Sequence, residues 1–243
     1  MQAVNPFLPS WENIPDGEPL VFAGRIYLFG SHDRFDGDGY CMNDYVCYSA
    51  DTKNLKEWRY EGVIYRKNQD PRNQEGGHCM WAPDVAKGLD GRYYLYYCLD
   101  VLPEIGVAVS NAPTGPYEFM GLVHYPDGTP LGRKEKDYIQ FDPGILIDED
   151  GECYLYSGNG PRCKGLHENK ASQVMRLEAD MVPLKENRRL LLPAAETREG
   201  TGFEGFDFYE ASSIRKIGKI YYLIYSDRKS SSLCYAVSSF PDR

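Results

Sequence analysis

Short apolar segments rich in tyrosine recur along the chain, and each follows a turn that contains glycine. The four copies begin at intervals of about 60 to 67 residues and cover residues 24–31, 91–97, 151–157 and 218–226. Almost no stretch shows the 3.6-residue period of an amphipathic helix, whereas short tyrosine-rich runs between turns are typical of strands. The pattern therefore predicts an all-β chain built from a repeated unit.

A second strand signal follows each copy, and the first three copies continue into further strand and turn signals. A repeat of this length is close to one propeller blade with its loops, so it favours a β-propeller over a sandwich. A blade has four strands, but the fourth copy holds about two before residue 243. We therefore predict one incomplete propeller domain over residues 1–243. Its three full blades cover about 16–80, 81–140 and 141–205, and part of a fourth covers about 206–243.

Carboxylates recur just ahead of the segment expected to be the innermost strand of each unit. They are Asp16, Asp84, Asp142 and Glu210. Inner strands line a propeller's axis, so acids at equivalent points would surround one central pocket. Like charges held close together push their pKa values apart, which lets one act as a proton donor while another stays ionised.

Ordinary turn chemistry is the competing explanation, since Asp is common before Gly or Pro. Turn chemistry is the preferred explanation for Asp16 or Asp142 when each is taken alone. For Asp84 the turn explanation and the functional explanation are about equal. Glu210 has little turn preference and lies between an aromatic run and a strand. The recurrence of all four in register favours the functional explanation.

Charge and terminal sequence limit the partners and the location. With 36 acidic and 27 basic residues the net charge is -9, which opposes binding to nucleic acid. The first residues show neither a basic region nor an apolar run, and no apolar stretch is long enough to cross a bilayer. We expect a cytoplasmic protein without a membrane partner; the oligomeric state is not predicted.

The cysteines and histidines show no metal or disulfide spacing. Seven cysteines lack a Cys-x-x-Cys pair and four histidines lack a His-x-x-x-His pair. We expect most cysteines to be buried free thiols. The segments Asp36–Gly39 and Asp148–Gly151 resemble calcium loops but lack the full ligand pattern, so we expect turns. The basic run Lys185–Arg189 is expected to be a solvated loop.

The chain resembles glycoside hydrolase family 43 over essentially its whole length. The resemblance rests, in order, on Pro-Asp-Gly-Glu-Pro at 15–19, Trp-Ala-Pro-Asp at 81–84, Asp-Pro at 142–143 with Asp-Glu-Asp-Gly at 148–151, and Glu-Ala-Ser-Ser at 210–213. It implies a five-bladed β-propeller with a central sugar pocket and an inverting hydrolase. By resemblance, Asp16 is the general base, Glu210 the general acid, and Asp142 tunes and orients that acid. Asp84 matches a position that flanks the pocket, with a supporting role.

The resemblance also bears on cofactors. No metal or organic cofactor is required for the implied chemistry. A structural calcium ion is an implication of the family, but the family's last blade, with a histidine associated with a central metal ion, has no counterpart in this sequence.

Sugar binding requires flat apolar faces near polar groups. Trp81 is the best stacking candidate because it immediately precedes Ala82-Pro83-Asp84, although a core position between blades competes with this role. His32 and Asp33, expected at the end of the first inner strand, and Phe206 and Tyr209, near Glu210, are candidate pocket walls. For these four residues, wall and core are comparable explanations.

Three functions fit the sequence. The first is a pentosidase, a β-xylosidase or α-L-arabinofuranosidase, acting on small plant-type oligosaccharides. The second is another five-bladed carbohydrate enzyme, such as a fructan hydrolase or a mannoside phosphorylase. Fructan enzymes should show Asn-Asp-Pro and Glu-Cys, where this chain has Pro15-Asp16-Gly17 and Glu210-Ala211. The third is a non-catalytic sugar-binding propeller, in which Glu210→Gln would leave binding intact.

Overall fold

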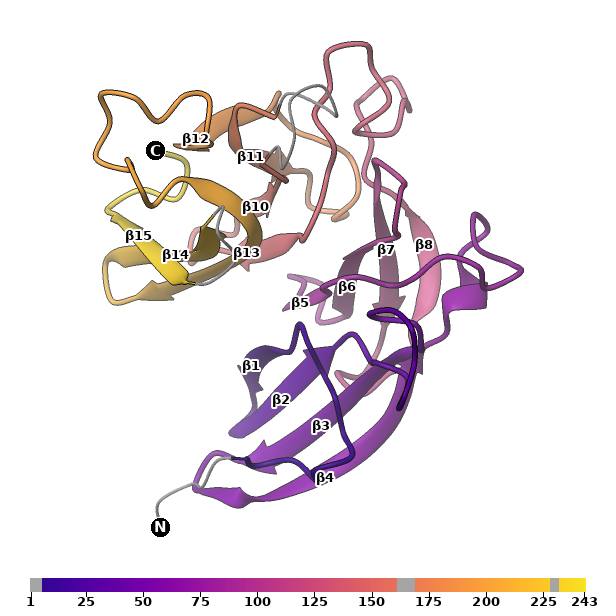
Figure 1. Ribbon diagram of the computed structural model, residues 1–243. Helices are drawn as coiled ribbons and strands as arrows, with labels where there is room; N and C mark the ends of the chain where they lie inside the picture. Colours follow the sequence, from indigo (N-terminus) through magenta and orange to yellow (C-terminus); the bar gives the residue numbers. More distant parts are fainter. Residues whose placement is uncertain (1–5, 161–168, 228–231) are drawn as a thin grey trace.

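The protein folds into four antiparallel sheets, each made of strands that are consecutive in the sequence (Figure 1). The computed structural model describes residues 6–160, 169–227 and 232–243. Blade 1 contains β1 (Glu18–Phe22), β2 (Arg25–Gly30), β3 (Tyr45–Asp51) and β4 (Asn54–Tyr65). Blade 2 contains β5 (Asp84–Lys87), β6 (Tyr93–Cys98), β7 (Ile105–Ser110) and β8 (Glu118–Leu122).

The second half of the chain repeats this order. Blade 3 contains β9 (Gly144–Ile147), β10 (Cys153–Ser157), β11 (Ala171–Leu177) and β12 (Arg189–Pro193). Blade 4 contains β13 (Phe208–Ile217), β14 (Ile220–Asp227) and β15 (Leu233–Ser238). The prediction of an all-β propeller is confirmed, with four blades. Among the described residues the single helical element is a short 3-10 turn at Lys67–Gln69.

Two details of the predicted repeat are wrong. The tyrosine-rich segments form the second strand of each sheet, namely β2, β6, β10 and β14, and not the innermost one. His32 and Asp33 therefore follow a second strand, whereas the sequence placed them after an inner strand. Blade 4 also has three strands, one more than predicted, because β13 is a full strand of its own.

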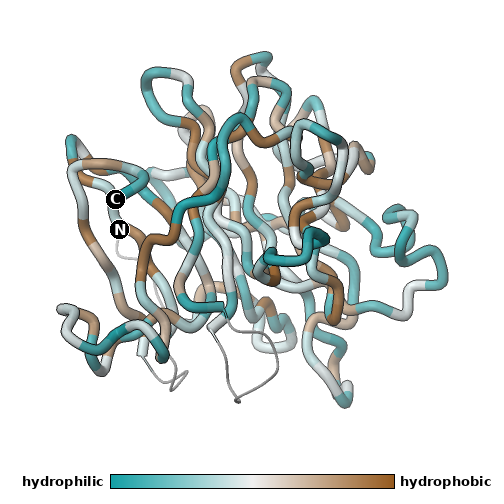
Figure 2. The backbone as a smooth tube through the Cα atoms, turned by 90° about the horizontal axis from the view of Figure 1, so that it is seen from above, coloured by the Kyte–Doolittle hydropathy of each residue, from teal (hydrophilic) through white to brown (hydrophobic). Residues whose placement is uncertain are grey.

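Apolar side chains fill the three seams between successive blades. Phe29 and Tyr45 of blade 1 pack with Leu95 of blade 2 in one buried cluster. Equivalent clusters join blade 2 to blade 3, through Val107 and Leu155, and blade 3 to blade 4. Figure 2 shows apolar stretches, in brown, alternating with hydrophilic ones along the chain, and many of the outer loops are hydrophilic. Burial of these large side chains is the main force that stacks the blades in chain order.

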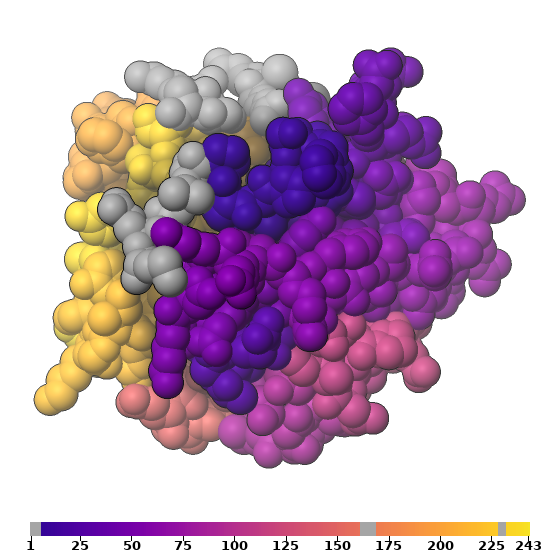
Figure 3. Space-filling view, turned by 90° about the horizontal axis from the view of Figure 1, so that it is seen from below, coloured from indigo at the N-terminus to yellow at the C-terminus, as the bar shows by residue number. Residues whose placement is uncertain are grey.

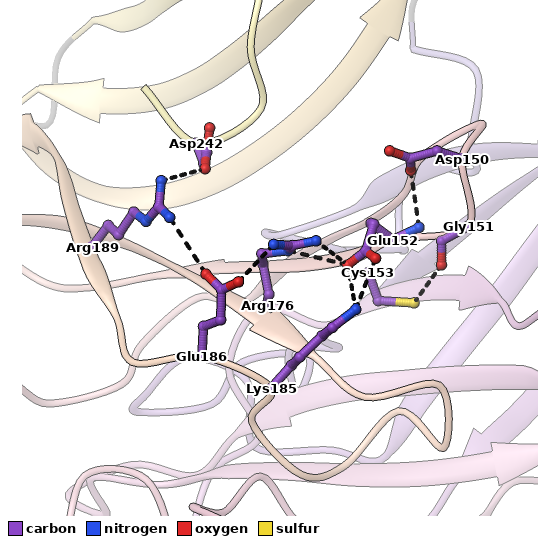
Figure 4. A network of polar contacts seen from close by, with 9 residues as sticks. All are labelled: Asp150, Gly151, Glu152, Cys153, Arg176, Lys185, Glu186, Arg189 and Asp242. Carbon is purple, nitrogen blue, oxygen red and sulfur yellow. Dashed lines mark hydrogen bonds and ion pairs between the residues drawn. The ribbon is translucent and has the colours of Figure 1, made fainter.

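Ion pairs from the basic run reinforce the outer edge of blade 3. Lys185 and Arg176 both bind Glu152, and Arg189 joins β12 to Asp242 at the end of blade 4, with Nη1 and Oδ2 2.6 Å apart (Figure 4). Arg188 pairs with Asp137. Residues 185–188 form a loop in which residues 185 and 187 are exposed, as expected, and the ion pairs of the run Lys185–Arg189 also tie neighbouring segments together.

The remaining sequence expectations concern turns, cysteines and the membrane. Residues 149–150 form the turn between β9 and β10, as predicted for that segment. Cys41, Cys47, Cys98 and Cys153 are buried free thiols, as expected, and Cys79 and Cys234 are half-buried. Cys163 and His167 lie outside the described residues. Across the described ranges, no helix combines the length and the apolar character needed to cross a membrane.

Blade 4 has one apolar face that the described parts of the other blades leave exposed. Along β15, Cys234 and Ala236 pack toward blade 3, while the alternate residues Leu233, Tyr235 and Val237 are 80%, 68% and 57% exposed. Polar side chains are the usual occupants of a solvent-facing strand position. This strand is apolar on both faces, which is typical of a sheet packed on both sides.

Candidate active site

The four recurrent carboxylates all lie on, or immediately before, the first strand of a sheet. Asp16 precedes β1 by two residues and Asp142 precedes β9 by two. Asp84 and Glu210 lie inside β5 and β13, which corrects the expectation that every acid comes ahead of its strand. In Figure 1 the labels β1, β5 and β13 stand near the middle of the molecule. The first strands therefore bring acids from distant parts of the sequence toward the same region.

Asp142 is the most deeply buried of the three predicted catalytic acids, with 6% of its surface exposed. Its backbone has φ of 45°, and Oδ2 accepts a hydrogen bond of 3.0 Å from the backbone N–H of Ala211. Burial raises the pKa of Asp142 well above its usual range, and the charges of Glu210 and Asp16 raise this pKa further. Asp142 therefore lies within electrostatic reach of both other acids.

An irregular segment of β13 presents Glu210. The pairing of β13 with β14 shifts register on both sides of this residue, and Ala211 has φ of 65°. Bulges of this kind re-aim side chains and are common beside active sites. Glu210 is half-buried, and its Oε2 accepts a 3.0 Å hydrogen bond from Nδ2 of Asn159. Sequence reasoning missed Asn159; the available signal was a polar residue just beyond a tyrosine-rich strand.

Two donors hold one oxygen of Asp16. Its Oδ2 accepts hydrogen bonds from Ser31 Oγ at 3.0 Å and from Cys41 Sγ at 3.5 Å. Burial raises the pKa of the Cys41 thiol, so this sulfur stays protonated and donates. No partner for Oδ1 is seen among the described residues, which leaves it available to a water molecule. Ser31 and Cys41 were also missed from the sequence, because neither lies in a recognisable motif.

The predicted wall residues near Asp16 organise its surroundings. The Oδ1 of Asp33 accepts a 2.7 Å hydrogen bond from the backbone N–H of Cys41, and the Nε2 of His32 lies 3.5 Å from Oε2 of Glu12. Asp33 therefore helps to hold Cys41 where its thiol reaches Asp16. Direct sugar contact by His32 or Asp33 stays a prediction.

The aromatic candidates differ in exposure. Tyr209 is buried, whereas Phe206 is largely exposed. Trp81 is half-buried and its ring lies 5.8 Å from the ring of Phe141, between centroids. Its indole N–H is buried without a hydrogen-bond partner among the described residues. Such a donor beside a polar site suits a sugar hydroxyl. Stacking on a sugar or hydrogen bonding to it by Trp81 stays a prediction.

Asp84 joins two blades. Its two oxygens accept hydrogen bonds from the backbone N–H groups of Val85, at 2.7 Å, and of Ile145 in β9, at 2.8 Å. Burial and the nearby charge of Glu18 raise the pKa of Asp84 to about 8, against the opposing effect of Arg215 and these two amides. These contacts make Asp84 a structural tie at the inner strands. Its supporting role beside the pocket stays a prediction.

The described residues do not fit the metal ion that the family resemblance implies. No group of three or more His, Cys, Asp or Glu side chains within them is arranged to hold one. The carboxylates here contact backbone amides, hydroxyls and a thiol instead. No chemical step is therefore assigned to a metal.

A comparison with protein families identifies the relationship. The sequence model of the family Glycosyl hydrolases family 43 matches residues 5–240. This chain belongs to that family. A xylosidase/arabinosidase from Thermoclostridium stercorarium is 52% identical over 242 residues, covering 100% of this chain and 50% of the relative. Xylosidase/arabinosidase 43A from Humicola insolens is 31% identical and matches 90% of this chain and 74% of its own length.

Solved structures agree with this family 43 assignment. The GH43_1 enzyme from Xanthomonas citri, in complex with xylose, superposes with a TM-score of 0.77 at 26% identity. The match covers 98% of this chain and 73% of that enzyme. The family 43 chain therefore spans half the length of the T. stercorarium relative and about three-quarters of the solved enzyme.

Proposed function

We propose that this chain forms the catalytic propeller of an inverting glycoside hydrolase that removes pentose units from small plant-type oligosaccharides. The observation that carries the proposal is the hydrogen bond from the N–H of Ala211, the residue after Glu210, to Asp142; the charges of Glu210 and Asp16, which raise the pKa of Asp142, support it. Three acids from blades 1, 3 and 4 in one environment provide a proton donor and a base, as hydrolysis of a glycosidic bond requires.

The substrate class is supported by the relatives. Those from T. stercorarium and H. insolens are named xylosidase/arabinosidases, and the solved X. citri enzyme holds xylose. A terminal or side-chain β-xyloside or α-L-arabinofuranoside is therefore the proposed substrate. The sequence signature of fructan enzymes is missing at both acids, which places that alternative second.

In the proposed mechanism, Glu210 donates its proton to the leaving oxygen while Asp16 takes a proton from the attacking water. The water attacks C1 from the opposite face, the C1–O bond breaks, and the product has inverted configuration. Like charges disfavour ionising Asp142 and Glu210 together, so this pair retains a proton for donation. Room for the water requires the carboxyls of Asp16 and Glu210 to lie about 6.5 to 9.5 Å apart.

We also propose that the working ring has five blades, of which this chain supplies three and part of a fourth. The support comes from blade 4, whose sheet has three strands where the others have four, and whose outer face exposes Leu233, Tyr235 and Val237. A further strand beside β15 would complete the four-stranded sheet of blade 4, and a fifth sheet would cover its exposed apolar face. The alternative, a non-catalytic sugar-binding propeller, is decided by the same experiment as the activity.

The experiment measures hydrolysis of xylo-oligosaccharides and of aryl xylosides and arabinofuranosides. It compares this chain with a chimera that continues into the unmatched half of the T. stercorarium relative. Glu210→Gln should lower kcat on oligosaccharides by about 10²–10⁴-fold, and should lower it less on aryl glycosides whose leaving group needs no proton. Glu204→Gln, at an exposed loop glutamate, is the matched control.

Three outcomes would contradict the proposal. Full activity of Glu210→Gln on natural oligosaccharides would exclude Glu210 as the general acid. Release of the retained anomer, measured by NMR during the reaction, would exclude inversion. Sugar binding by the chimera without any turnover would favour the non-catalytic alternative.

A further inference from the structure

Asp16 and Glu210 belong to blades 1 and 4, the two end blades of this chain, whose first strands β1 and β13 contact each other; this contact is called the polar seam. Two residues beyond Asp16, the carboxylate of Glu18 pairs with the guanidinium of Arg215 on β13. The same carboxylate accepts a 2.9 Å hydrogen bond from Ser213 Oγ, and Arg215 Nη2 donates at 2.9 Å to the carbonyl of Pro19. We call Glu18, Ser213 and Arg215 the seam clamp.

The clamp is a polar connection between these two blades. Within the described residues, every hydrogen bond and ion pair between blade 1 and blade 4 uses Ser213 or Arg215 on one side and Glu18 or Pro19 on the other. The buried apolar clusters join blades 1 to 2, 2 to 3 and 3 to 4. In the space-filling view, indigo and purple blade 1 lies next to yellow blade 4 (Figure 3).

The clamp is a fixed arrangement, and it is partly shielded from water. The side chains of Arg215 and Glu18 are 28% and 16% exposed. Arg215 Nη1 also donates to the carbonyl of Ile214 at 2.6 Å, which limits rotation of the guanidinium. The buried carboxyl of Asp84 lies within electrostatic reach of Glu18 and Arg215. Loss of Arg215 would leave Glu18 without its cation in a partly buried site, an unfavourable state.

We propose that the seam clamp sets the separation between the carboxyls of Asp16 and Glu210, and that its three members are positioning residues. The inference rests on the proposed function for its consequence in catalysis. Glu18 is only two residues from Asp16, and Ser213 is three from Glu210, so a shift at the clamp moves both acids. A misplacement of about 1 Å can cost about 10²-fold in rate.

The kinetic test compares Arg215→Met with Arg215→Lys and with the charge reversal Glu18→Arg/Arg215→Glu, on xylo-oligosaccharides. We expect Arg215→Met to lower kcat by about 10–100-fold with little change in KM. Arg215→Lys and the double reversal should recover part of the loss. Arg189→Met is the matched control, because it breaks an ion pair between blades 3 and 4 at the outer edge. It should leave kcat unchanged.

Hydrogen exchange gives a readout that needs no activity. Arg215→Met should speed amide exchange in residues 14–22 and 208–217 relative to the unaltered chain. Arg189→Met should affect only residues 189–193 and 238–243. Unchanged exchange in the first two segments would overturn the clamp whether or not the chain hydrolyses sugars. If Arg215→Met fails to fold, Arg215→Lys and Ser213→Ala are measured in the same way.

The two proposals fail separately. If Glu210→Gln keeps full activity, the proposed function is wrong, and hydrogen exchange alone judges the clamp. If Glu210→Gln is inactive but Arg215→Met keeps the kcat of the unaltered chain, the clamp is wrong and the function stands.

Discussion

The seams between blades 1 and 2, 2 and 3, and 3 and 4 differ in kind from the contact between the first strands of the end blades 1 and 4. The first three are filled with buried aliphatic and aromatic side chains. The last is joined by an ion pair and two hydrogen bonds around Glu18 and Arg215. Apolar packing is non-directional and gains in proportion to area, whereas charge-assisted hydrogen bonds fix geometry.

This difference assigns separate tasks to the two kinds of seam. The apolar seams stack the blades and supply most of the stability of the fold. The polar seam separates Asp16 from Glu210, the two acids whose distance decides the proposed chemistry. Changes at the polar seam should therefore affect catalysis more than stability, and changes at an apolar seam should do the reverse.

The largest expected effect is on catalysis, at the polar seam. Asp16→Asn keeps an oxygen that accepts from Ser31 and Cys41 but removes the base, so kcat should fall by about 10²–10⁴-fold. The melting temperature should stay within a few degrees of the unaltered chain, because the side chain keeps its size and its donors. Steady-state kinetics and calorimetry on the same samples test both parts. A large loss of melting temperature with unchanged kcat would reverse the assignment of tasks.

The next effect is on stability, at an apolar seam. Leu155 is fully buried between blades 2 and 3, so Leu155→Ala should lower the free energy of unfolding by about 2–5 kcal/mol. Urea titration measures this loss, and the conservative variant Leu155→Met should lose much less. The folded fraction of Leu155→Ala should keep its kcat. If Leu155→Ala lowers the free energy of unfolding by less than a surface substitution does, this seam is not the source of stability.

The sequence predicted the repeat because each blade carries the same local signals. Tyrosine-rich strands after glycine turns identify the second strand of every blade, and the four acids follow the same spacing. The segment of β13 was placed in the fourth unit but not predicted as a separate strand, because Phe208–Ile217 is mixed in polarity and has an irregular register. Local sequence patterns therefore predicted most of the strands, whereas the position of each strand within its sheet depends on tertiary pairing.

The candidate site could be predicted less completely than the fold. The acids stood out because Asp and Glu recur in register, but their partners do not recur. Ser31, Cys41 and Asn159 reach the acids through loops after second strands, and the loop path is set by contacts such as Asp33 with the Cys41 amide. The clamp at Glu18 and Arg215 joins residues 197 positions apart, a pairing that no local pattern indicates.

Asp142 shares features with both kinds of seam. It is buried, like the residues of the apolar seams, and its carboxyl lies within electrostatic reach of Asp16 and Glu210. Its pKa is raised by burial and by Glu210 and Asp16. A carboxyl whose folded-state pKa is raised favours the folded state most at low pH. That contribution falls once the pH exceeds the usual value for an unfolded Asp, about 4, and continues to fall until the raised pKa is passed.

Asp142→Asn should therefore stabilise the fold by about 1 kcal/mol near neutral pH while it lowers kcat. Asn tolerates the φ of 45° and its oxygen still accepts from the Ala211 N–H, but it cannot ionise. The gain should be small at pH 4 and grow toward pH 8, because only the unaltered chain has a carboxyl here that ionises in the unfolded state while burial opposes its ionisation in the folded state. Melting curves of both proteins across this range measure it. A gain that is constant with pH would show that ionisation of Asp142 does not cost stability.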